Sequence, residues 1–348
     1  MKSSTIRMLQ PAVPVDEPDA AVIVITSGST GAAKGVVLSR AAIRSSVEAT
    51  HDRLGGPGDW VLALPTHHVA GLMVLARALI AGRSAVPARG DLADLPDVAD
   101  RLGARRYLSL VPTQLGRALG DVELSRALAR FDAVLIGGGP VAPDVLKRAA
   151  GGGIVVVTTY GLSETCGGCV YDGVPLAGTR IELGPPAGPA GRRIMINSQA
   201  VFSGYRLNPE LTATTLINGW LRTEDRGRWH GDQLIVLGRL DQVVIIGGRK
   251  VDLAEVERQV NEWAAARGGE GFAIGLPDPD WGTTIAAACT TGGSLEELHD
   301  HLRSRVPGHA LPRTLTRLDL LPRLSGGKPD RIAIRDLIMN ERGARVTP

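Results

Sequence analysis

The sequence predicts a large layered α/β domain with a mainly parallel sheet, followed by a small α+β domain. From residue 21 onward, short apolar runs alternate with segments of helical periodicity, which is typical of parallel βαβ units. After about residue 176 the predicted strands become short and are joined by close turns. A chain of 348 residues also exceeds one ordinary domain. We therefore expect a first domain over residues 1–238 and a second over residues 239–348.

The elements of the first domain follow from apolar runs and helix signals. Runs rich in Val, Ile and Leu predict strands at residues 21–26, 36–38, 60–64, 107–111, 133–136 and 154–159. Ser39 is a candidate N-cap for a helix that runs to about Arg53. Further helices are predicted over residues 68–80, before Gly82, and over residues 142–150.

The second part of the chain combines short strands with amphipathic helices. Strands are predicted at residues 193–197, 234–237 and 243–246. Residues 252–266 place Leu253, Val256, Val260 and Trp263 on one face of a helix, with charges opposite. Two more helices are expected at residues 294–303 and near residues 332–339. The domain junction is predicted at residues 239–241.

Composition narrows the class of protein. Hydrophobic residues make up 44% of the chain and aromatic residues 3%, so aliphatic side chains must fill the core. The 39 basic and 36 acidic residues nearly balance, and without a long basic run this argues against a nucleic-acid binder. No apolar run reaches the ~18 residues of a membrane span, and no signal-peptide pattern opens the chain. We expect a cytoplasmic protein.

Cys166 and Cys169 form a CxxC pattern, for which metal and redox chemistry are alternatives. A zinc site would require a second pair of ligands, and a thioredoxin-like site would require the motif to open a helix. Neither is evident in the sequence. We expect reduced structural thiols, as in most intracellular proteins.

The most informative segment is TSGSTGAAKG at residues 26–35, directly after a predicted strand. Glycines allow close backbone approach, hydroxyls and amides donate hydrogen bonds, and the lysine adds charge, so the composition suits a loop around phosphates. It is not a Walker A loop, and composition alone leaves a flexible surface loop open. The candidate phosphate-binding residues are Thr26, Ser27, Gly28, Ser29, Thr30, Gly31 and Lys34.

This segment resembles the phosphate-loop signature of the adenylate-forming family, which includes acyl-CoA synthetases, luciferases and adenylation domains of peptide synthetases. A second segment, YGLSET at residues 160–165, resembles the family's Y-G-x-T-E motif. The resemblance implies that Tyr160 and Gly161 lie near the adenine, that Glu164 helps to hold Mg²⁺ and that Thr165 touches the α-phosphate. Ser163 stands where Thr is commoner. A solvated loop acid is the alternative for Glu164.

Two further segments fit the same series. Gly137, Gly138 and Gly139 end a predicted strand, where glycines let a flat ring lie against the backbone at the carboxyl edge of the sheet, although a plain turn would look alike. PTHHVAG at residues 65–71 resembles the family's P-x-x-H-x-x-G segment. It implies that His68 lies beside the acyl pocket, with a capping or core histidine as the alternative.

Downstream segments resemble the ribose, hinge and thiol-channel motifs. In TED at residues 223–225, Asp225 would accept from the ribose hydroxyls, and Glu224 departs from the usual Gly. In GRLD at residues 238–241, Arg239 would contact ribose or phosphate and Asp241 would be the hinge. The resemblance implies that Gly247 and Gly248 face the pantetheine of CoA, although two glycines after a strand also make a common hairpin turn.

LPRLSGGK at residues 321–328 resembles the family's terminal motif and brings Lys328 into the predicted site. The resemblance implies that the small domain is mobile and rotates about Asp241. Lys328 would bridge the substrate carboxylate and the α-phosphate during adenylate formation. It would then be withdrawn for thioester formation.

The substrate prediction depends on two segments beyond these motifs. ATHDRLGGPG at residues 49–58 and TYGLSETCGGCVYDGVP at residues 159–175 resemble compact actinobacterial 2-succinylbenzoate–CoA ligases of menaquinone synthesis. The resemblance implies ATP, Mg²⁺ and coenzyme A as cofactors or co-substrates, and a small carboxylic acid as substrate. Candidates for contact with that acid are His67, Ser163, Arg105 and Arg106.

Several alternatives stay open at this point. Another aryl- or acyl-CoA ligase would share the same motifs. A carrier-loading adenylation enzyme is also compatible, although no carrier-like attachment segment follows the small domain. An inactive nucleotide-binding protein is the alternative outside enzymes. A homodimer is left open.

Overall fold

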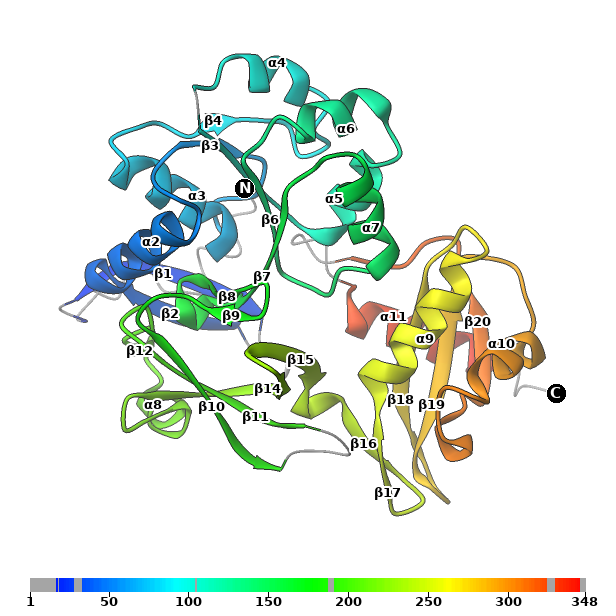
Figure 1. The fold of residues 1–348 in the computed structure, drawn as a ribbon. Coiled ribbons are helices and arrows are strands. Elements are labelled where there is room, and N and C mark those ends of the chain that lie inside the picture. The colour runs from blue at the N-terminus through cyan, green and yellow to red at the C-terminus, as the bar shows by residue number, and fades with distance from the viewer. Residues whose placement is uncertain are drawn as a thin grey trace. The chain divides into compact units, whose positions relative to one another are not determined.

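The computed structural model describes residues 17, 19–27, 33–103, 105–186, 191–323 and 329–344. For residues 342–344 it describes the backbone and not the side chains. The chain divides into two compact units (Figure 1). Unit 1 comprises Met1–Glu182, Met195–Thr223 and Trp229–Ile235, and unit 2 comprises Leu183–Ile194, Glu224–Arg228 and Val236–Pro348. The predicted boundary between residues 238 and 239 stays a prediction.

A seven-stranded sheet in the order β4-β3-β5-β6-β7-β8-β9 forms the centre of unit 1. Neighbouring strands from β4 to β7 run parallel, and β8 and β9 add antiparallel pairs. The predicted mainly parallel sheet is therefore confirmed. The strands are β3 (Asp59–Leu62), β4 (Val86–Pro87), β5 (Arg106–Leu110), β6 (Ala133–Ile136), β7 (Val156–Leu162), β8 (Gly167–Tyr171) and β9 (Val174–Pro175).

Helices cover both faces of this sheet, because alternate side chains of each strand point to opposite faces. On β3, Val61 packs in the cluster that contains Leu95 and Leu115, whereas Trp60 packs in the cluster that contains Val74 and Ala78. The helices of unit 1 that pack here are α2 (Arg40–Arg53), α3 (Val69–Ile80), α4 (Leu95–Asp100), α5 (Pro112–Ala118), α6 (Val122–Leu128) and α7 (Pro143–Gly151), as Figure 1 shows.

The first two strands depart from the predicted βαβ pattern. β1 (Ala20–Ser27) and β2 (Ala33–Ser39) pair antiparallel, and β12 (Gly204–Tyr205) pairs with β2 to complete a separate sheet. A parallel pair would need a crossover of a dozen or more residues, and the segment between these strands is too short for one. Ser39 caps α2, as predicted, by accepting a hydrogen bond from the Ala42 N–H at 3.0 Å.

A third sheet has the order β10-β11-β14-β13, with β15 paired to β14. The division between the two units passes through four of its strands. Its strands are β10 (Thr179–Pro186), β11 (Arg192–Ser198), β13 (Leu216–Ile217), β14 (Trp220–His230) and β15 (Gln233–Arg239), and α8 (Pro209–Thr215) precedes β13.

Unit 2 contains a hairpin and a three-stranded sheet with helices on both faces. On β18, Ala273 packs in the cluster of α9 and α10, whereas Phe272 packs with Ile334 of α11. Its further elements are η2 (Leu240–Gln242), β16 (Val243–Ile246), β17 (Arg249–Asp252), α9 (Leu253–Ala265), β18 (Gly271–Asp278), β19 (Gly282–Cys289), α10 (Leu295–Leu302), η3 (Gly308–Ala310), β20 (Thr314–Arg317) and α11 (Arg331–Ala344). Among the helices described, none has the length and apolar character that a membrane crossing requires.

Candidate functional site

The carboxyl ends of the parallel strands bring several predicted residues to one edge of the sheet in unit 1. Gly137, Gly138 and Gly139 follow β6, the segment that contains His68 follows β3, and β7 leads into η1 (Ser163–Thr165). Gly138 has a φ of +83°, a conformation that favours glycine. Ligands of open α/β sheets bind at this edge. The assignment of these residues to a nucleotide site stays a prediction.

The Tyr160-Gly161 pair lies inside β7, not after it as the sequence suggested, because β7 continues into an antiparallel pairing with β8. A Cβ added at Gly161 would lie 1.9 Å from the carbonyl oxygen of Gly167. Only glycine fits this approach. The close crossing sets the path of the turn that carries Glu164.

Thr165 holds that turn together. Its side chain is fully buried, and its hydroxyl accepts from the Leu162 N–H at 2.8 Å and donates to the Gly167 carbonyl at 2.7 Å. The next residue, Cys166, adopts a left-handed conformation with φ +51°. The predicted contact of Thr165 with phosphate stays a prediction, and the observed bonds give this hydroxyl a structural role.

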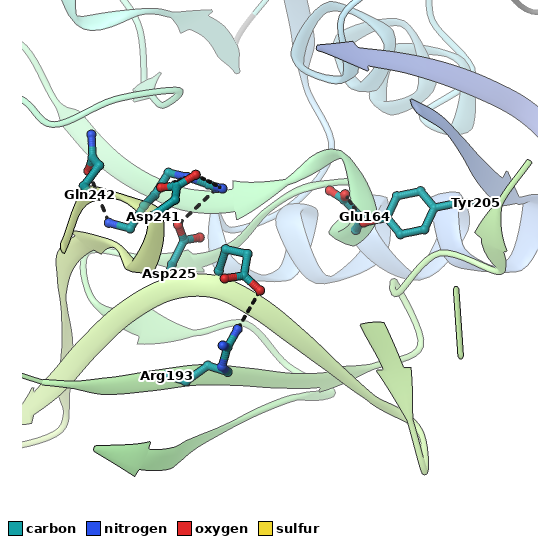
Figure 2. Close-up of polar contacts among 8 residues, drawn as sticks. Glu164, Arg193, Tyr205, Asp225, Asp241 and Gln242 are labelled. Atoms are coloured by element: carbon teal, nitrogen blue, oxygen red, sulfur yellow. Dashed lines mark hydrogen bonds and ion pairs between the residues drawn. The ribbon is translucent and has the colours of Figure 1, made fainter. Parts of the chain in front are cut away.

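The carboxylate of Glu164 is held by a residue that the sequence analysis missed. The Tyr205 hydroxyl donates to Glu164 Oε1 at 2.7 Å (Figure 2). The Phe202 N–H donates to the Glu164 carbonyl at 2.8 Å. Tyr205 belongs to the two-residue strand β12, which has no apolar run of its own, so no periodicity marked it. Glu164 is therefore an oriented carboxylate and not a free loop acid.

The ends of the predicted phosphate loop lie in the β1–β2 hairpin. Thr26 pairs with Lys34, and Ser27 pairs with Ala33. The Lys34 ammonium lies 5.4 Å from the centroid of the Tyr205 ring. Lys34 and Glu164 thus contact the same tyrosine. The remaining predicted loop residues, Gly28, Ser29, Thr30 and Gly31, lie outside the described residues.

The two histidines mark the start of α3. His68 occupies the N-cap position without a side-chain capping bond, and its ring lies 4.3 Å from the ring of His67, centroid to centroid. A Cβ at Gly71 would lie 2.3 Å from the Pro65 carbonyl oxygen, so the Pro65–Gly71 segment turns tightly. The His68 side chain therefore does not cap α3. The contact of His68 with the acyl substrate stays a prediction.

Arg105 and Arg106 lie at the opposite edge of the sheet, which argues against their assignment as substrate anchors. Arg106 opens β5 and is opposite Asp59, the first residue of β3. Its side chain donates to the Gly103 carbonyl at 2.9 Å, while its backbone N–H donates to Asp132. The length of β5, about 15 Å, separates these arginines from the carboxyl edge. Spacing along the chain could not reveal which strand end they occupy.

In unit 2, the predicted ribose and hinge residues form one charged cluster. Arg239 donates to Asp241 at 3.0 Å and lies 3.8 Å from a carboxylate oxygen of Asp225, which is mostly buried (Figure 2). Burial works against the charge of Arg239, but the hydrogen bond and charge of Asp241, with the charges of Asp225 and Glu224, raise its pKa above the ordinary value. The roles in ribose binding and hinge motion stay predictions.

Glu224, which departs from the family's usual glycine, has a partner in this chain. The Arg193 guanidinium donates to its carboxylate at 2.7 Å (Figure 2). The departure is therefore accommodated by a surface ion pair between β11 and β14. Asp225 keeps its mostly buried position beside Arg239.

Gly247 and Gly248 form a two-residue hairpin turn between β16 and β17. Both have positive φ, +54° and +76°, and Ile246 pairs with Arg249. A Cβ at Gly247 would lie 2.6 Å from the indole of Trp281. The Arg313 guanidinium lies 5.2 Å from the same ring, so a half-exposed aromatic surface and a cation adjoin the turn. The thiol-channel assignment stays a prediction.

Lys328 lies outside the described residues. The segment that carries it is bounded by an antiparallel bridge between Arg323 and Pro329. Arg323 also forms an ion pair with Glu270. The described residues on either side of Lys328 both belong to unit 2.

Comparison with known proteins decides the family. The model of the AMP-binding enzyme family matches residues 2–202, more than half of the chain. A probable 2-succinylbenzoate–CoA ligase of Mycobacterium tuberculosis is 44% identical over 331 residues, which cover 91% of this chain and 84% of the relative. The chain belongs to the AMP-binding enzyme family. The predicted family and the reaction class of an ATP-dependent acid–thiol ligase are confirmed.

Solved structures of AMP-binding enzymes agree with this assignment. An o-succinylbenzoate CoA synthetase (MenE) of Bacillus subtilis in complex with its acyl-adenylate intermediate has a TM-score of 0.81 at 28% identity, covering 91% of this chain and 69% of that one. The same enzyme with ATP and a magnesium ion has a TM-score of 0.80 at 27% identity, with 91% and 70% coverage. The predicted α/β fold of the adenylate-forming enzymes is confirmed.

The residues present fit the magnesium ion that AMP-binding enzymes imply. Among the residues described, no group of three or more His, Cys, Asp or Glu side chains could hold a metal by itself. Mg²⁺ is commonly bound by one or two carboxylates together with substrate phosphates. Glu164, with one carboxylate oxygen fixed by Tyr205, has the chemistry that such a site requires, and its role as a magnesium ligand stays a prediction.

Cys166 and Cys169, the two cysteines of the CxxC pattern, lie in the interior of unit 1. Cys166 and Cys169 are buried and free, and burial raises the pKa of each thiol to about 12. Since the thiolate is the nucleophile and the metal ligand, neither is poised for redox or metal chemistry. The expectation that these thiols are reduced and structural stays a prediction.

Proposed function

We propose that this AMP-binding enzyme is a 2-succinylbenzoate–CoA ligase. The observation that carries the proposal is the 44% identity to the Mycobacterium tuberculosis ligase over 91% of the chain. The oriented Glu164, the glycines at the strand ends and the hairpin of Gly247 and Gly248 support the proposal, because such an enzyme would need a cation ligand, an adenine surface and a thiol channel. The reaction would convert ATP, 2-succinylbenzoate and CoA to succinylbenzoyl-CoA, AMP and pyrophosphate.

The reaction has two steps. A carboxylate oxygen of the succinyl arm attacks the α-phosphorus of ATP. The bond between this phosphorus and the oxygen that bridges it to the β-phosphorus breaks, and pyrophosphate leaves. The CoA sulfur then attacks the acyl carbon of the adenylate, AMP leaves, and the thiol proton passes to water. Because the attacking carboxylate is already ionised, positioning and charge neutralisation suffice for the first step.

Residues of unit 1 would bind the adenine and the phosphates. Gly137–Gly139 and Tyr160 would offer a flat surface to the ring, and Lys34 would add charge beside the phosphates. Glu164 would hold Mg²⁺ together with phosphate oxygens, and this cation would withdraw charge from the leaving pyrophosphate. Thr165 would act indirectly, because its hydroxyl fixes the turn that presents Glu164.

Residues of the second part of the chain would bind the ribose and complete the catalytic arrangement. Asp225, mostly buried beside Arg239, would accept from the ribose hydroxyls. Lys328 would bridge the substrate carboxylate and the α-phosphate in the first step. Rotation about Asp241 would withdraw it before the second step, a hinge transition of the small domain.

The CoA thiol would enter beside the Gly247–Gly248 turn. Trp281 next to that turn exposes 44% of its surface, and Arg313 lies over its ring. An exposed aromatic ring with an adjacent cation is suited to a base and its phosphates. We therefore assign CoA nucleotide contacts to Trp281 and Arg313.

The second carboxylate of the substrate needs its own partner. With Arg105 and Arg106 placed at the far edge of the sheet, His67 and Ser163 are the candidates that follow the carboxyl ends of strands. Both contain hydrogen-bond donors suited to a benzoate group. The specificity of the ligase for its acid would then depend on His67 and Ser163.

The deciding experiment is ATP–pyrophosphate exchange with 2-succinylbenzoate, benzoate and fatty acids, followed by CoA-dependent release of AMP. We expect exchange with 2-succinylbenzoate alone and thioester formation when CoA is added. Exchange that is as fast with benzoate or fatty acids would instead indicate another aryl- or acyl-CoA ligase. Acid-dependent exchange without transfer to CoA would indicate an enzyme that loads a carrier protein.

A further inference from the structure

Tyr205 joins the two charged groups that the proposed reaction places at the phosphates. Its hydroxyl donates to Glu164 Oε1 at 2.7 Å, and the Lys34 ammonium lies 5.4 Å from the centre of its ring (Figure 2 shows the first contact). The residue is buried, with 9% of its surface exposed. A phenol in this position contacts both a carboxylate and a cation without carrying charge itself.

The backbone around Tyr205 leaves this side chain little freedom. Its N–H donates to Thr212 Oγ1 at 2.8 Å, and the N–H groups of Ser203 and Arg206 donate to carbonyls of β2 at 2.9 and 2.8 Å. The Phe202 ring meets the Tyr205 ring edge-on, 4.8 Å between centroids. The hydroxyl is therefore preorganised toward Glu164.

The same segment connects Glu164 to the strand that leads out of the predicted phosphate loop. The Phe202 N–H donates to the Glu164 carbonyl, and Tyr205 pairs with Val36 of β2. One short segment thus fixes the backbone and the side chain of Glu164 and also pairs with the strand that carries Lys34. Removal of the Tyr205 hydroxyl would therefore change the orientation of the Glu164 carboxylate, while the backbone bonds that hold the segment would remain.

We propose that Tyr205 is a positioning residue that fixes Glu164 Oε1 and leaves the other carboxylate oxygen directed to the cation of the bound nucleotide. This inference rests on the proposed function, since it takes Glu164 as a ligand of Mg²⁺. Groups that orient a metal ligand commonly contribute about 10- to 100-fold to metal affinity. Tyr205 touches the ligand and not the reacting atoms, so it acts through Glu164.

The test removes one hydroxyl and measures cation binding without the reaction. Mn²⁺ is titrated by electron paramagnetic resonance into the full chain with a saturating non-hydrolysable ATP analogue, for wild type and Tyr205→Phe. We expect Tyr205→Phe to bind Mn²⁺ about 10-fold more weakly, with unchanged affinity for the analogue in the absence of metal. Tyr171→Phe is the matched control, because it removes a buried hydroxyl that bonds Thr50 at 3.1 Å.

A double-mutant cycle with Glu164→Gln separates positioning from general structure. The Tyr205→Phe effect should vanish in the Glu164→Gln background, because the hydroxyl then has no carboxylate to orient. Equal Mn²⁺ affinities of Tyr205→Phe and wild type would overturn the proposal. So would an equal weakening in the Glu164→Gln background, or the same weakening in Tyr171→Phe.

A second measurement keeps the native hydroxyl, in case Tyr205→Phe does not fold. With 3-fluorotyrosine at position 205, the fluorine resonance should shift when Mg²⁺ is added to the nucleotide-bound protein, and a resonance that does not move contradicts the proposal. The proposed function fails separately, if wild type shows no exchange with 2-succinylbenzoate. Mn²⁺ binding needs no acid, so the two failures are distinguishable.

Discussion

Two short turns in this enzyme carry proposed functional groups, and they are held in different ways. The turn of η1 is fixed by buried bonds of Thr165, by the close crossing at Gly161 and by contacts from Phe202 and Tyr205. The Gly247–Gly248 turn is exposed and is held by strand pairing and by one bond to the backbone of Trp281. The proposed adenylation site is thus preorganised, whereas the proposed thiol site depends on a surface hairpin.

The largest expected effect separates the two half-reactions. Lys328→Ala should lower adenylate formation about 100- to 1,000-fold, because a preorganised charged donor is lost. Thioester formation from supplied acyl-adenylate should continue. Pyrophosphate exchange and thioester assays measure the two steps, and Lys147→Ala on the exposed side of α7 is the matched control. Parallel loss of both half-reactions would contradict the assignment of Lys328 to the first step.

The rigidity of the first turn can be tested at Thr165. Thr165→Val keeps the shape but leaves the Leu162 N–H without its partner, which should cost about 1–3 kcal/mol in the free energy of unfolding. Adenylate formation should also fall, since the turn carries Glu164. Thr165→Ser retains the hydroxyl and should lose much less. Chemical denaturation and pyrophosphate exchange together give the result, and equal stability of the Val and Ser variants would refute the structural role.

The second turn offers a matched pair of glycines. Ala at either position meets a left-handed backbone, which costs roughly 1–2 kcal/mol, but only Gly247→Ala also runs into Trp281. A Cβ at Gly248 meets nothing within 4 Å. We expect Gly247→Ala to raise KM for CoA several-fold more than Gly248→Ala does.

Steady-state kinetics in CoA provide the measurement, with pyrophosphate exchange as the internal reference. Exchange should be unchanged in both glycine variants, because the turn belongs to the second step. If the two variants raise KM equally, Trp281 has no part in CoA binding. Trp281→Ala then gives an independent check with the glycines intact.

The smallest expected effect is on the pH dependence of stability, and it involves α2, the helix that is hydrogen-bonded to the η1 turn. α2 supports this turn through Ser46, whose hydroxyl donates to the Cys166 carbonyl at 3.1 Å. His51 on the same helix is mostly buried, and this burial, with the charge of Arg77, lowers its pKa below 6.5 against the opposing charges of Asp52 and Glu48.

The sign of the pH dependence follows from that depressed pKa. Below pH 6.5 the unfolded chain takes up a proton at His51 that the folded protein does not, so the folded state loses stability as the pH falls from 7 toward 5. His51→Gln should flatten this part of the profile, measured as unfolding free energy against pH. His230→Gln, at an exposed position, should leave it unchanged. An identical slope in all three proteins would assign the dependence to other groups.

The sequence by itself determined the class of fold, the family and the order of the motifs. Strand-type runs and glycines at their ends are local features, so residues 133–139 could be recognised as a strand and its turn without any tertiary contact. The N-cap at Ser39 could likewise be predicted from the sequence, because it depends on residues three positions apart. The acid–thiol ligase class followed from motif resemblance alone.

Only the tertiary structure decided which residues meet. Tyr205 lies 41 positions from Glu164 along the chain, and a two-residue strand has no sequence pattern that predicts their contact. Arg105 and Arg106 were candidate anchors, and only the direction of β5 shows that they lie at its amino end, away from the strand ends that carry the other predicted residues. Side-chain pairing over long separations depends on strand direction and register, and a single sequence encodes these only through the packing of the whole unit.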